Sequence, residues 1–248
     1  MRQIFTSVPY ILPEEPAETA AICKARGTER TVKKGEVLKR GGEHARLYFI
    51  LRGLAAYFVA EELTDRGTIM ALIPPGRVAG DLTANIGNSC NVTTRMLTAG
   101  AVLSVPPDAI SEAMREHPEL SQTVVRNVIA KEECHLEGMI ANFTLPPAQR
   151  LKVLFRAALG ADPLDDSVPW YELPWELSAQ TVGQIVNLNR VSVARLISAW
   201  IKEGLLKRAG RKLCVRPSLF DDVYDWEKAN ADAVRPRWVS PSSGQRKG

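Results

Sequence analysis

The stretch from Leu177 to Val215 constrains the fold of this chain more than any other. Ser178 can cap a first short helix, whose apolar residues fall at helical spacing until the turn-forming amides of Asn187 and Asn189 break the pattern. Asn189 can cap a second helix, and Gly204 can end it. The stretch therefore predicts a helix-turn-helix. The face of the second helix that is expected to be buried consists of Val193, Leu196, Ile197, Trp200 and Ile201.

The other face of the second helix is polar and basic. Between Arg190 and Arg216 there are eight Lys or Arg and one acid, so this segment carries +7 while the whole chain carries +4. A run of charge alone usually marks a solvated surface. Here it coincides with the helix-turn-helix and with a predicted β-hairpin wing around Ala209-Gly210, and the combination indicates a nucleic acid ligand. The expected DNA contacts are Arg190, Val191, Ser192, Arg195, Ser178, Gln180, Lys202 and Lys212.

The first half of the chain has a different texture. A short helix is expected from Ala17 to Arg26, and from Thr31 short strands alternate with glycine-rich turns at intervals of about ten residues. This spacing is typical of an antiparallel sandwich or roll. A short strand, WYEL, is expected just before the helix-turn-helix.

A long helix is predicted from about Pro118, after a short one near Asp108 to Glu116. Its apolar residues recur in steps of three and four, which is roughly the period of a coiled coil, and they predict a dimerisation seam. Two prolines after Leu145 end the helix and predict a hinge, followed by an amphipathic helix from Ala148 to Leu159. The dimerisation residues are Val125, Ile129, Leu136, Met139 and Phe143.

These elements predict an α+β chain with an N-terminal antiparallel β-roll of the jelly-roll type, a long dimerisation helix and a C-terminal winged helix-turn-helix. The expected divisions are an effector-sensing domain at 1–115, the dimerisation helix and hinge at 116–147, a DNA-binding domain at 148–234 and a flexible basic tail at 235–248.

Composition argues against several other classes of protein. No apolar stretch is long enough to span a membrane and the N-terminus lacks a signal peptide's centre, so a cytoplasmic protein is expected. The four cysteines and three histidines are isolated, without metal-ligand spacing, so no metal or cofactor is identified. An enzyme built on a metal-binding cupin-like roll is therefore the weaker alternative, and no catalytic residues are assigned.

Two stretches resemble a known family. KGEVLKRGGEHARLYFILRG and LIPPGRVAGDL look like the sensor roll of the cyclic-AMP receptor protein and fumarate-nitrate regulator (CRP/FNR) family of bacterial transcription factors, and 177–215 resembles its helix-turn-helix. The similarity runs from about Val32 to Leu219. It implies a homodimer that binds a small effector in its sensor domains and a palindromic operator with its C-terminal domains, and that contacts RNA polymerase. An activator is expected, with repression left open as the alternative. A sensor module that controls a partner protein instead of DNA is disfavoured by the basic second helix.

The sequence says less about the identity of the effector than about DNA binding. The family's cyclic-AMP binders resemble one another in a Gly-Glu-Leu turn followed by an Arg-Ser pair, whereas this chain has Gly80-Asp81-Leu82 and no arginine at the matching place. Cyclic nucleotide is therefore disfavoured, although Arg95 is nearby. Iron-sulfur sensing is disfavoured because the clustered N-terminal cysteines are absent, and for haem the axial-ligand candidate retained is His135.

The remaining effector hypothesis is an uncharged or weakly acidic molecule held between the roll and the long helix. GDLTANIGNSCNVT and RVSVAR are similar to the CprK branch of the family, whose effectors are chlorinated phenols, so an aromatic effector is the leading hypothesis, with Lys131 or Arg95 offsetting the charge of Asp81. The candidate effector residues are Asp81, Leu82, Asn85, Asn91, Thr93, Thr94, Lys131 and His135.

The second helix also predicts a sequence preference. Most members of the family resemble RETVGR or VETISR here, with a glutamate that can accept from the cytosine amino group, whereas this chain has Val191 in that place. An apolar side chain can pack on a thymine methyl but cannot select cytosine. We therefore expect an A·T-rich inverted repeat with TTA-type half-sites, Arg195 on a guanine or a phosphate, and Ser178 and Gln180 on phosphates.

Overall fold

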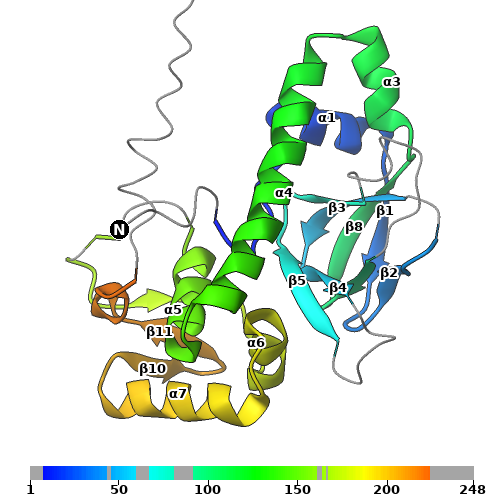
Figure 1. The fold of residues 1–248 in the computed structure, drawn as a ribbon. Coiled ribbons are helices and arrows are strands. Elements are labelled where there is room, and N and C mark those ends of the chain that lie inside the picture. The colour runs from blue at the N-terminus through cyan, green and yellow to red at the C-terminus, as the bar shows by residue number, and fades with distance from the viewer. Residues whose placement is uncertain are drawn as a thin grey trace, which may run out of the picture.

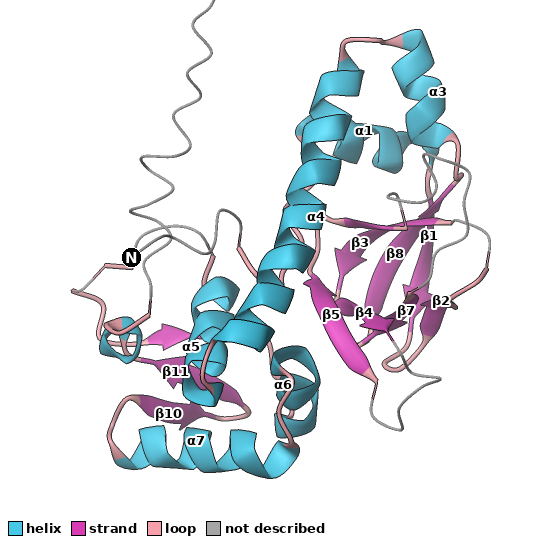
Figure 2. Ribbon diagram, viewed as in Figure 1, coloured by secondary structure: helices cyan, strands magenta, loops and turns pink. Residues whose placement is uncertain are grey.

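The computed structural model of the chain describes residues 8–43, 46–59, 67–80, 92–160, 164–165 and 167–223. Within them the sensor half is a roll of two four-stranded antiparallel sheets (Figures 1 and 2). The first sheet has the order β1 (Thr28–Val32), β8 (Gly100–Val105), β3 (Leu47–Arg52) and β6 (Val78–Ala79). The second has the order β2 (Val37–Lys39), β7 (Thr93–Met96), β4 (Ala55–Val59) and β5 (Thr68–Ile73).

Several helices lie against the roll. α1 (Ala17–Arg26) and α3 (Ala109–Glu116) lie together at one end, joined by the ion pair from Arg26 to Glu112 at 2.6 Å. α4 (Leu120–Thr144) then runs down past the roll to the second half of the molecule (Figure 1). No helix in the described part of the chain is long and apolar enough to cross a membrane.

The C-terminal half is a winged helix-turn-helix. α5 (Pro147–Ala158) packs on α6 (Ala179–Val186) and α7 (Arg190–Lys202), and a three-stranded sheet follows in the order β10 (Leu206–Ala209), β11 (Lys212–Val215) and β9 (Tyr171–Glu172). A short 3-10 helix, η1 (Pro217–Phe220), ends the described chain. The predicted fold class, both caps and the wing are confirmed.

The turn between α6 and α7 shows why this stretch folds as it does. Asn187 takes the left-handed conformation at φ 51°, and the Leu188 amide then donates to the carbonyl of Gly183 at 2.9 Å. A Cβ on Gly183 would lie 2.4 Å from the Leu188 carbonyl oxygen, so only glycine permits this close approach. The hydroxyl of Ser178 and the amide oxygen of Asn189 accept from the first-turn amides of α6 and α7.

One expectation for the second helix is wrong. Ile201 was expected on its buried face but is 37% exposed, whereas its neighbour Trp200 in the same last turn is 6% exposed and takes the buried position. Val193, Ile197 and Trp200 are buried as expected.

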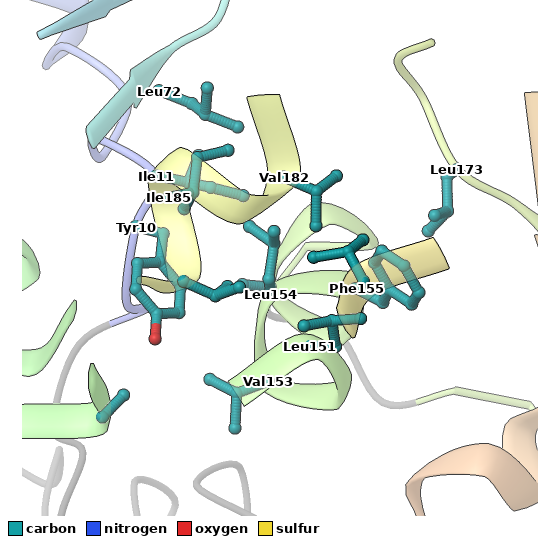
Figure 3. Packing of buried hydrophobic residues seen from close by; sticks show 14 of the residues in the cluster. Tyr10, Ile11, Leu72, Leu151, Val153, Leu154, Phe155, Leu173, Val182 and Ile185 are labelled. Atoms are coloured by element: carbon teal, nitrogen blue, oxygen red, sulfur yellow. The ribbon is translucent and has the colours of Figure 1, made fainter. Parts of the chain in front are cut away.

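The two halves of the molecule share one hydrophobic core (Figure 3). Tyr10 and Ile11 of the N-terminal segment and Leu72 of β5 pack in the same cluster as Leu154 of α5 and Ile185 of α6. Burial of these apolar side chains holds the C-terminal half against the roll.

Candidate functional site: a recognition surface and a sensor region

The N-terminal part of α7 presents the predicted DNA contacts to the outside. Arg190, Val191 and Arg195 are exposed, with Val191 56% exposed, while Ser192 is half-buried. They line a cleft of about 970 Å³ together with Gln180 of α6. Across the cleft lie Gly67 and Thr68, at the start of β5 in the roll. The recognition surface therefore opens towards the sensor domain in this conformation.

Three basic residues in and next to the wing make two kinds of contact. Lys212, one of the predicted DNA contacts, is half-buried and its ammonium lies 2.6 Å from a carboxylate oxygen of Glu172, which offsets its charge. Lys207 and Arg216 instead lie over the ring of Trp170, at 4.3 and 4.7 Å from its centroid. This cation-π cluster was not predicted, although both cations belong to the alternating apolar and basic stretch from which the wing was predicted.

The predicted dimerisation residues form a row of exposed apolar side chains along α4. Val125, Ile129, Leu136 and Met139 are each about half exposed and Phe143 is 80% exposed. Large apolar side chains in such numbers on one helix face are unusual on a monomer's surface and mark an interaction site.

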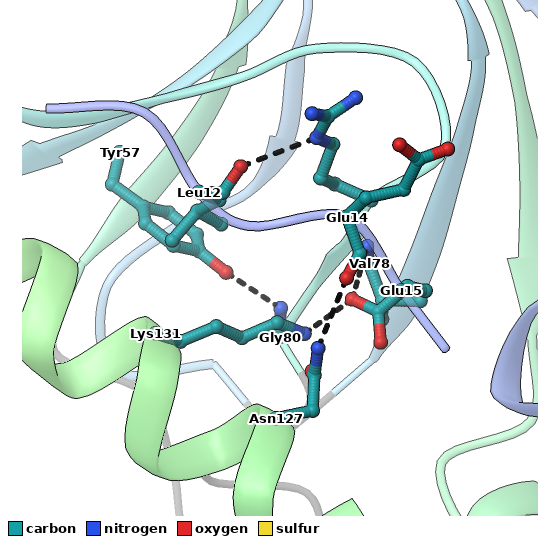
Figure 4. A network of polar contacts seen from close by, with 9 residues as sticks. Leu12, Glu14, Glu15, Tyr57, Val78, Gly80, Asn127 and Lys131 are labelled. Carbon is teal, nitrogen blue, oxygen red and sulfur yellow. Dashed lines mark hydrogen bonds and ion pairs between the residues drawn. The ribbon is translucent and has the colours of Figure 1, made fainter. Parts of the chain in front are cut away.

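The opposite face of α4 meets the N-terminal segment through polar groups. Lys131 is fully buried and pairs with the Glu15 carboxylate, which also accepts from the Val78 amide at 2.9 Å (Figure 4). Asn127 donates to the carbonyl of Glu14 at 3.2 Å. Lys131 was predicted to meet an effector, and here its charge meets a carboxylate of the protein's own chain.

Two of the other described effector candidates, His135 and Thr94, lie next to Tyr57. The ring of Tyr57 makes an edge contact with His135, 5.9 Å between centroids, and its hydroxyl accepts from the Gly80 amide at 3.0 Å. Thr94 is buried on β7 and pairs with Tyr57 in the strand register, and the Thr93 hydroxyl accepts from the Gly41 amide. Tyr57 was not among the predicted site residues. Asp81, Leu82, Asn85 and Asn91 lie outside the described residues.

A second set of contacts crosses the predicted hinge. α4 ends at Leu145 in an extended conformation and α5 begins at Pro147. The guanidinium of Arg150 donates to the Leu145 carbonyl at 2.7 Å and lies 3.5 Å from the carbonyl oxygens of Val186 and Asn187 at the end of α6. Arg150 therefore joins the hinge to the helix-turn-helix.

Tyr10 makes a longer connection between the same parts. Its hydroxyl donates to the side-chain carbonyl of Asn142 on α4 at 3.0 Å, and the Asn142 amide donates to the carbonyl of Ile185 on α6 at 2.9 Å. Burial raises the pKa of the Tyr10 phenol above its usual range, so it stays a neutral donor, although the charge of Arg150 acts in the opposite direction. No sequence pattern pointed to Tyr10 or to Asn142.

Comparisons with known proteins agree with this arrangement. Residues 29–117 match the family described as cyclic nucleotide-binding domain. A global nitrogen regulator from Nostoc sp. (strain PCC 7120) is 26% identical over 184 residues, which cover 71% of this chain and 78% of that protein.

Solved structures resemble the whole arrangement of roll, long helix and C-terminal domain. FixK2 from Bradyrhizobium japonicum is 17% identical with a TM-score of 0.69, covering 80% of this chain and 98% of its own. A CRP-family transcriptional regulator from Thermus thermophilus is 21% identical, TM-score 0.60, covering 77% and 94%. CprK complexed with OCPA is 16% identical, TM-score 0.59, covering 86% and 97%. At these identities the likeness is one of fold.

Proposed function

We propose that this chain, a regulator of the CRP/FNR type, binds an inverted-repeat DNA site as a homodimer and changes its DNA affinity when a small effector binds. The observation that carries the proposal is the recognition surface at the start of α7. Arg190, Val191 and Arg195 are exposed there on one side of a helix whose other side is buried, and Asn189 caps its first turn. A helix presented in this way fits the major groove.

Dimerisation follows from the apolar row on α4. Two copies of α4 that pair along this row would bury side chains that are now exposed, and would give the two recognition helices the two-fold symmetry of a palindromic operator. Because the hinge at Leu145 to Pro147 lies directly after the row, a change in the pairing of α4 can reorient the DNA-binding domains. A cytoplasmic location, activation of transcription and contact with RNA polymerase belong to the same proposal.

Selection of DNA from a random pool with the full-length protein tests the operator. We expect A·T-rich half-sites of the TTA type with no strict cytosine opposite Val191, because an apolar side chain cannot accept from the cytosine amino group. Recovery of a strict cytosine at that position would overturn the predicted sequence preference. Val191→Glu should create a preference for cytosine there.

Two substitutions separate base contacts from phosphate contacts. Arg195→Ala should weaken binding about 10- to 100-fold and relax one position of the site if Arg195 reads a guanine. Lys202→Ala should weaken all sequences about equally and lower the dependence of affinity on salt. If neither variant changes binding to any duplex, α7 is not the DNA-reading element.

The effector is proposed to be a small, mainly apolar molecule, with an aromatic compound favoured. Tyr57, Thr94 and His135 together supply an aromatic surface and oriented polar groups next to the Gly80 turn. Thermal-shift screening against cyclic nucleotides, haem and aromatic acids distinguishes the candidates. If a cyclic nucleotide is the only compound that stabilises the protein, the aromatic hypothesis is contradicted. If haem stabilises the wild type but not His135→Ala, that histidine is its ligand. Among the described residues no group of three or more His, Cys, Asp or Glu that could hold a metal ion occurs.

A further inference from the structure

A second pocket lies where the two halves of the molecule meet. It has a volume of about 540 Å³, within the range of small-molecule sites, and it is separate from the Tyr57 region. One wall is the N-terminal segment from Val8 to Glu14, which we call the strap, and the opposite wall combines Ala130 and Cys134 of α4 with the end of α5. Trp175, just before the helix-turn-helix, closes one side.

The lining is mainly apolar, and small side chains lie where the elements approach one another. Ala130, Ala157 and Ala158 leave room between α4 and α5, and Ile11 and Leu12 of the strap face the same space. Burial raises the pKa of the Cys134 thiol to about 12, so this group stays neutral, and it donates to the Ile11 carbonyl at 3.1 Å. An apolar molecule entering the pocket would find no charge on this wall to desolvate.

The polar groups at the pocket favour an uncharged ligand. Arg77 donates to the carbonyls of Leu12 at 3.2 Å and Pro75 at 2.5 Å, which use two of the five N–H groups of its guanidinium. The negative charge of Glu14 acts on Arg77, and the carbonyl end of α5 reaches the pocket at Leu159. Both offset the attraction that the Arg77 guanidinium would have for an added carboxylate. A neutral oxygen acceptor, by contrast, can take a remaining N–H of Arg77 at little electrostatic cost.

We propose that this pocket binds an uncharged, mainly apolar ring compound that carries a carbonyl or hydroxyl acceptor for Arg77. The site differs from the sensor region around Tyr57, and a molecule in it touches the roll, the long helix and the DNA-binding domain at once.

The strap provides the route from the pocket to the recognition helix. Its Leu12 amide donates to the Leu72 carbonyl at 3.0 Å, and the Leu72 amide donates to the Tyr10 carbonyl at 2.7 Å, so the strap is held on β5. Within the strap, next to the lining residue Ile11, Tyr10 takes a φ of 66°, and its hydroxyl starts the chain of hydrogen bonds through Asn142 to α6. The strap therefore holds, side by side, residues that line the pocket and the residue whose hydrogen bonds lead to α6.

Binding can be tested with a fluorescent naphthyl ketone, propionyl-dimethylaminonaphthalene, on the full-length protein. We expect saturable binding with emission shifted to the blue, displacement by acetylnaphthalene, and at least about tenfold weaker displacement by naphthoate, whose carboxylate meets Glu14 and the end of α5. Naphthoate displacing the probe as well as the neutral ketone would overturn the assignment of ligand class.

Variants place the probe in the pocket. Ala158→Leu should weaken binding at least about tenfold by filling the space, and Ala130→Leu should do the same from the other wall. Ala17→Leu, on an exposed face of α1, is the matched control and should bind like the wild type. Arg77→Met should weaken the ketone about tenfold. Unchanged affinity in both pocket-filling variants refutes the site, and circular dichroism of each variant checks that it folds.

The regulatory consequence rests on the proposed function, whereas probe binding does not. Acetylnaphthalene should change the affinity for the selected operator severalfold in the wild type, and Tyr10→Phe should bind the probe normally but lose that response, because the hydrogen bond to Asn142 is gone. If no DNA is bound at all, the proposed function fails while the pocket stands. An unaltered response in Tyr10→Phe would reject the strap as the route.

Discussion

The two faces of α4 differ in an unusual way. The face turned to the protein holds buried Asn127, Lys131 and His135 among smaller apolar residues, and the face turned outward holds the large apolar row ending at Phe143. A helix that packed only against its own roll would show the opposite pattern. The difference indicates that the polar face is held by specific hydrogen bonds and ion pairs within one chain, while the apolar face is suited to a second copy of the same helix.

Breaking the polar face should have the largest effect. Lys131→Met leaves the Glu15 carboxylate buried without its ammonium partner and should destabilise the fold by about 3–5 kcal/mol. The double variant Glu15→Gln with Lys131→Met should recover much of this loss, since no charge then remains. Urea unfolding measures both, and a double variant as unstable as Lys131→Met alone would contradict the explanation by charge pairing.

Breaking the apolar face should leave the fold intact and dissociate the dimer. Ile129→Glu places two carboxylates opposite each other across a desolvated seam and should weaken dimerisation at least about 100-fold, as measured by sedimentation equilibrium. The matched control is Ile201→Glu, the same change at an exposed isoleucine at the end of α7. The proposed seam would be wrong if both variants dimerised equally well.

A smaller effect is expected at the end of the polar face. Tyr10→Phe removes a hydrogen bond to Asn142 while keeping the ring that packs against Gly138, and should cost about 1 kcal/mol in the free energy of unfolding. Asn142→Ala also removes the bond to the Ile185 carbonyl and should cost more. The order of the two variants in thermal unfolding tests the chain of hydrogen bonds from Tyr10 through Asn142 to Ile185. If the Tyr10 variant is as stable as the wild type, the Tyr10 hydrogen bond does not contribute to stability.

The last effect appears only at alkaline pH. The thiol of Cys134 has its pKa raised from 9.0 to about 12 by burial, so between these values the unfolded chain releases a proton that the folded chain keeps. Stability is therefore lost as pH rises through this window. Cys134→Ala should lose less stability than the wild type between pH 9 and 12. A steeper alkaline loss in the variant would reverse the sign expected here.

Much of the fold could be predicted because its signals are local. The caps Ser178 and Asn189, the proline break after Leu145 and the glycine-rich turns of the roll all act within a few residues of themselves, and each element they predicted is present. The resemblance rests on contiguous stretches too, and the match of residues 29–117 to a cyclic nucleotide-binding domain agrees with it for the roll. The apolar row of α4 was also readable from its spacing, and its exposure agrees with the predicted seam, although dimerisation stays a prediction.

The parts that could not be predicted depend on residues far apart in the chain. Nothing local marks Glu15 as the partner of Lys131, 116 positions later, or Tyr10 as the partner of Asn142, 132 positions later. Lys131 was assigned to an effector as a charge that could offset Asp81, and its contact with Glu15 could not be foreseen from the sequence. The pocket beneath the strap likewise exists only because the N-terminal segment crosses between α4, α5 and the roll.

By itself the sequence determined the helix-turn-helix, the wing, the strands of the roll and the apolar seam, because backbone capping, turn chemistry and hydrophobic period are set by neighbouring residues. Only the tertiary structure decided what the strap holds, which buried charges neutralise each other and how the recognition surface lies towards the roll, because these depend on contacts that close long loops of chain.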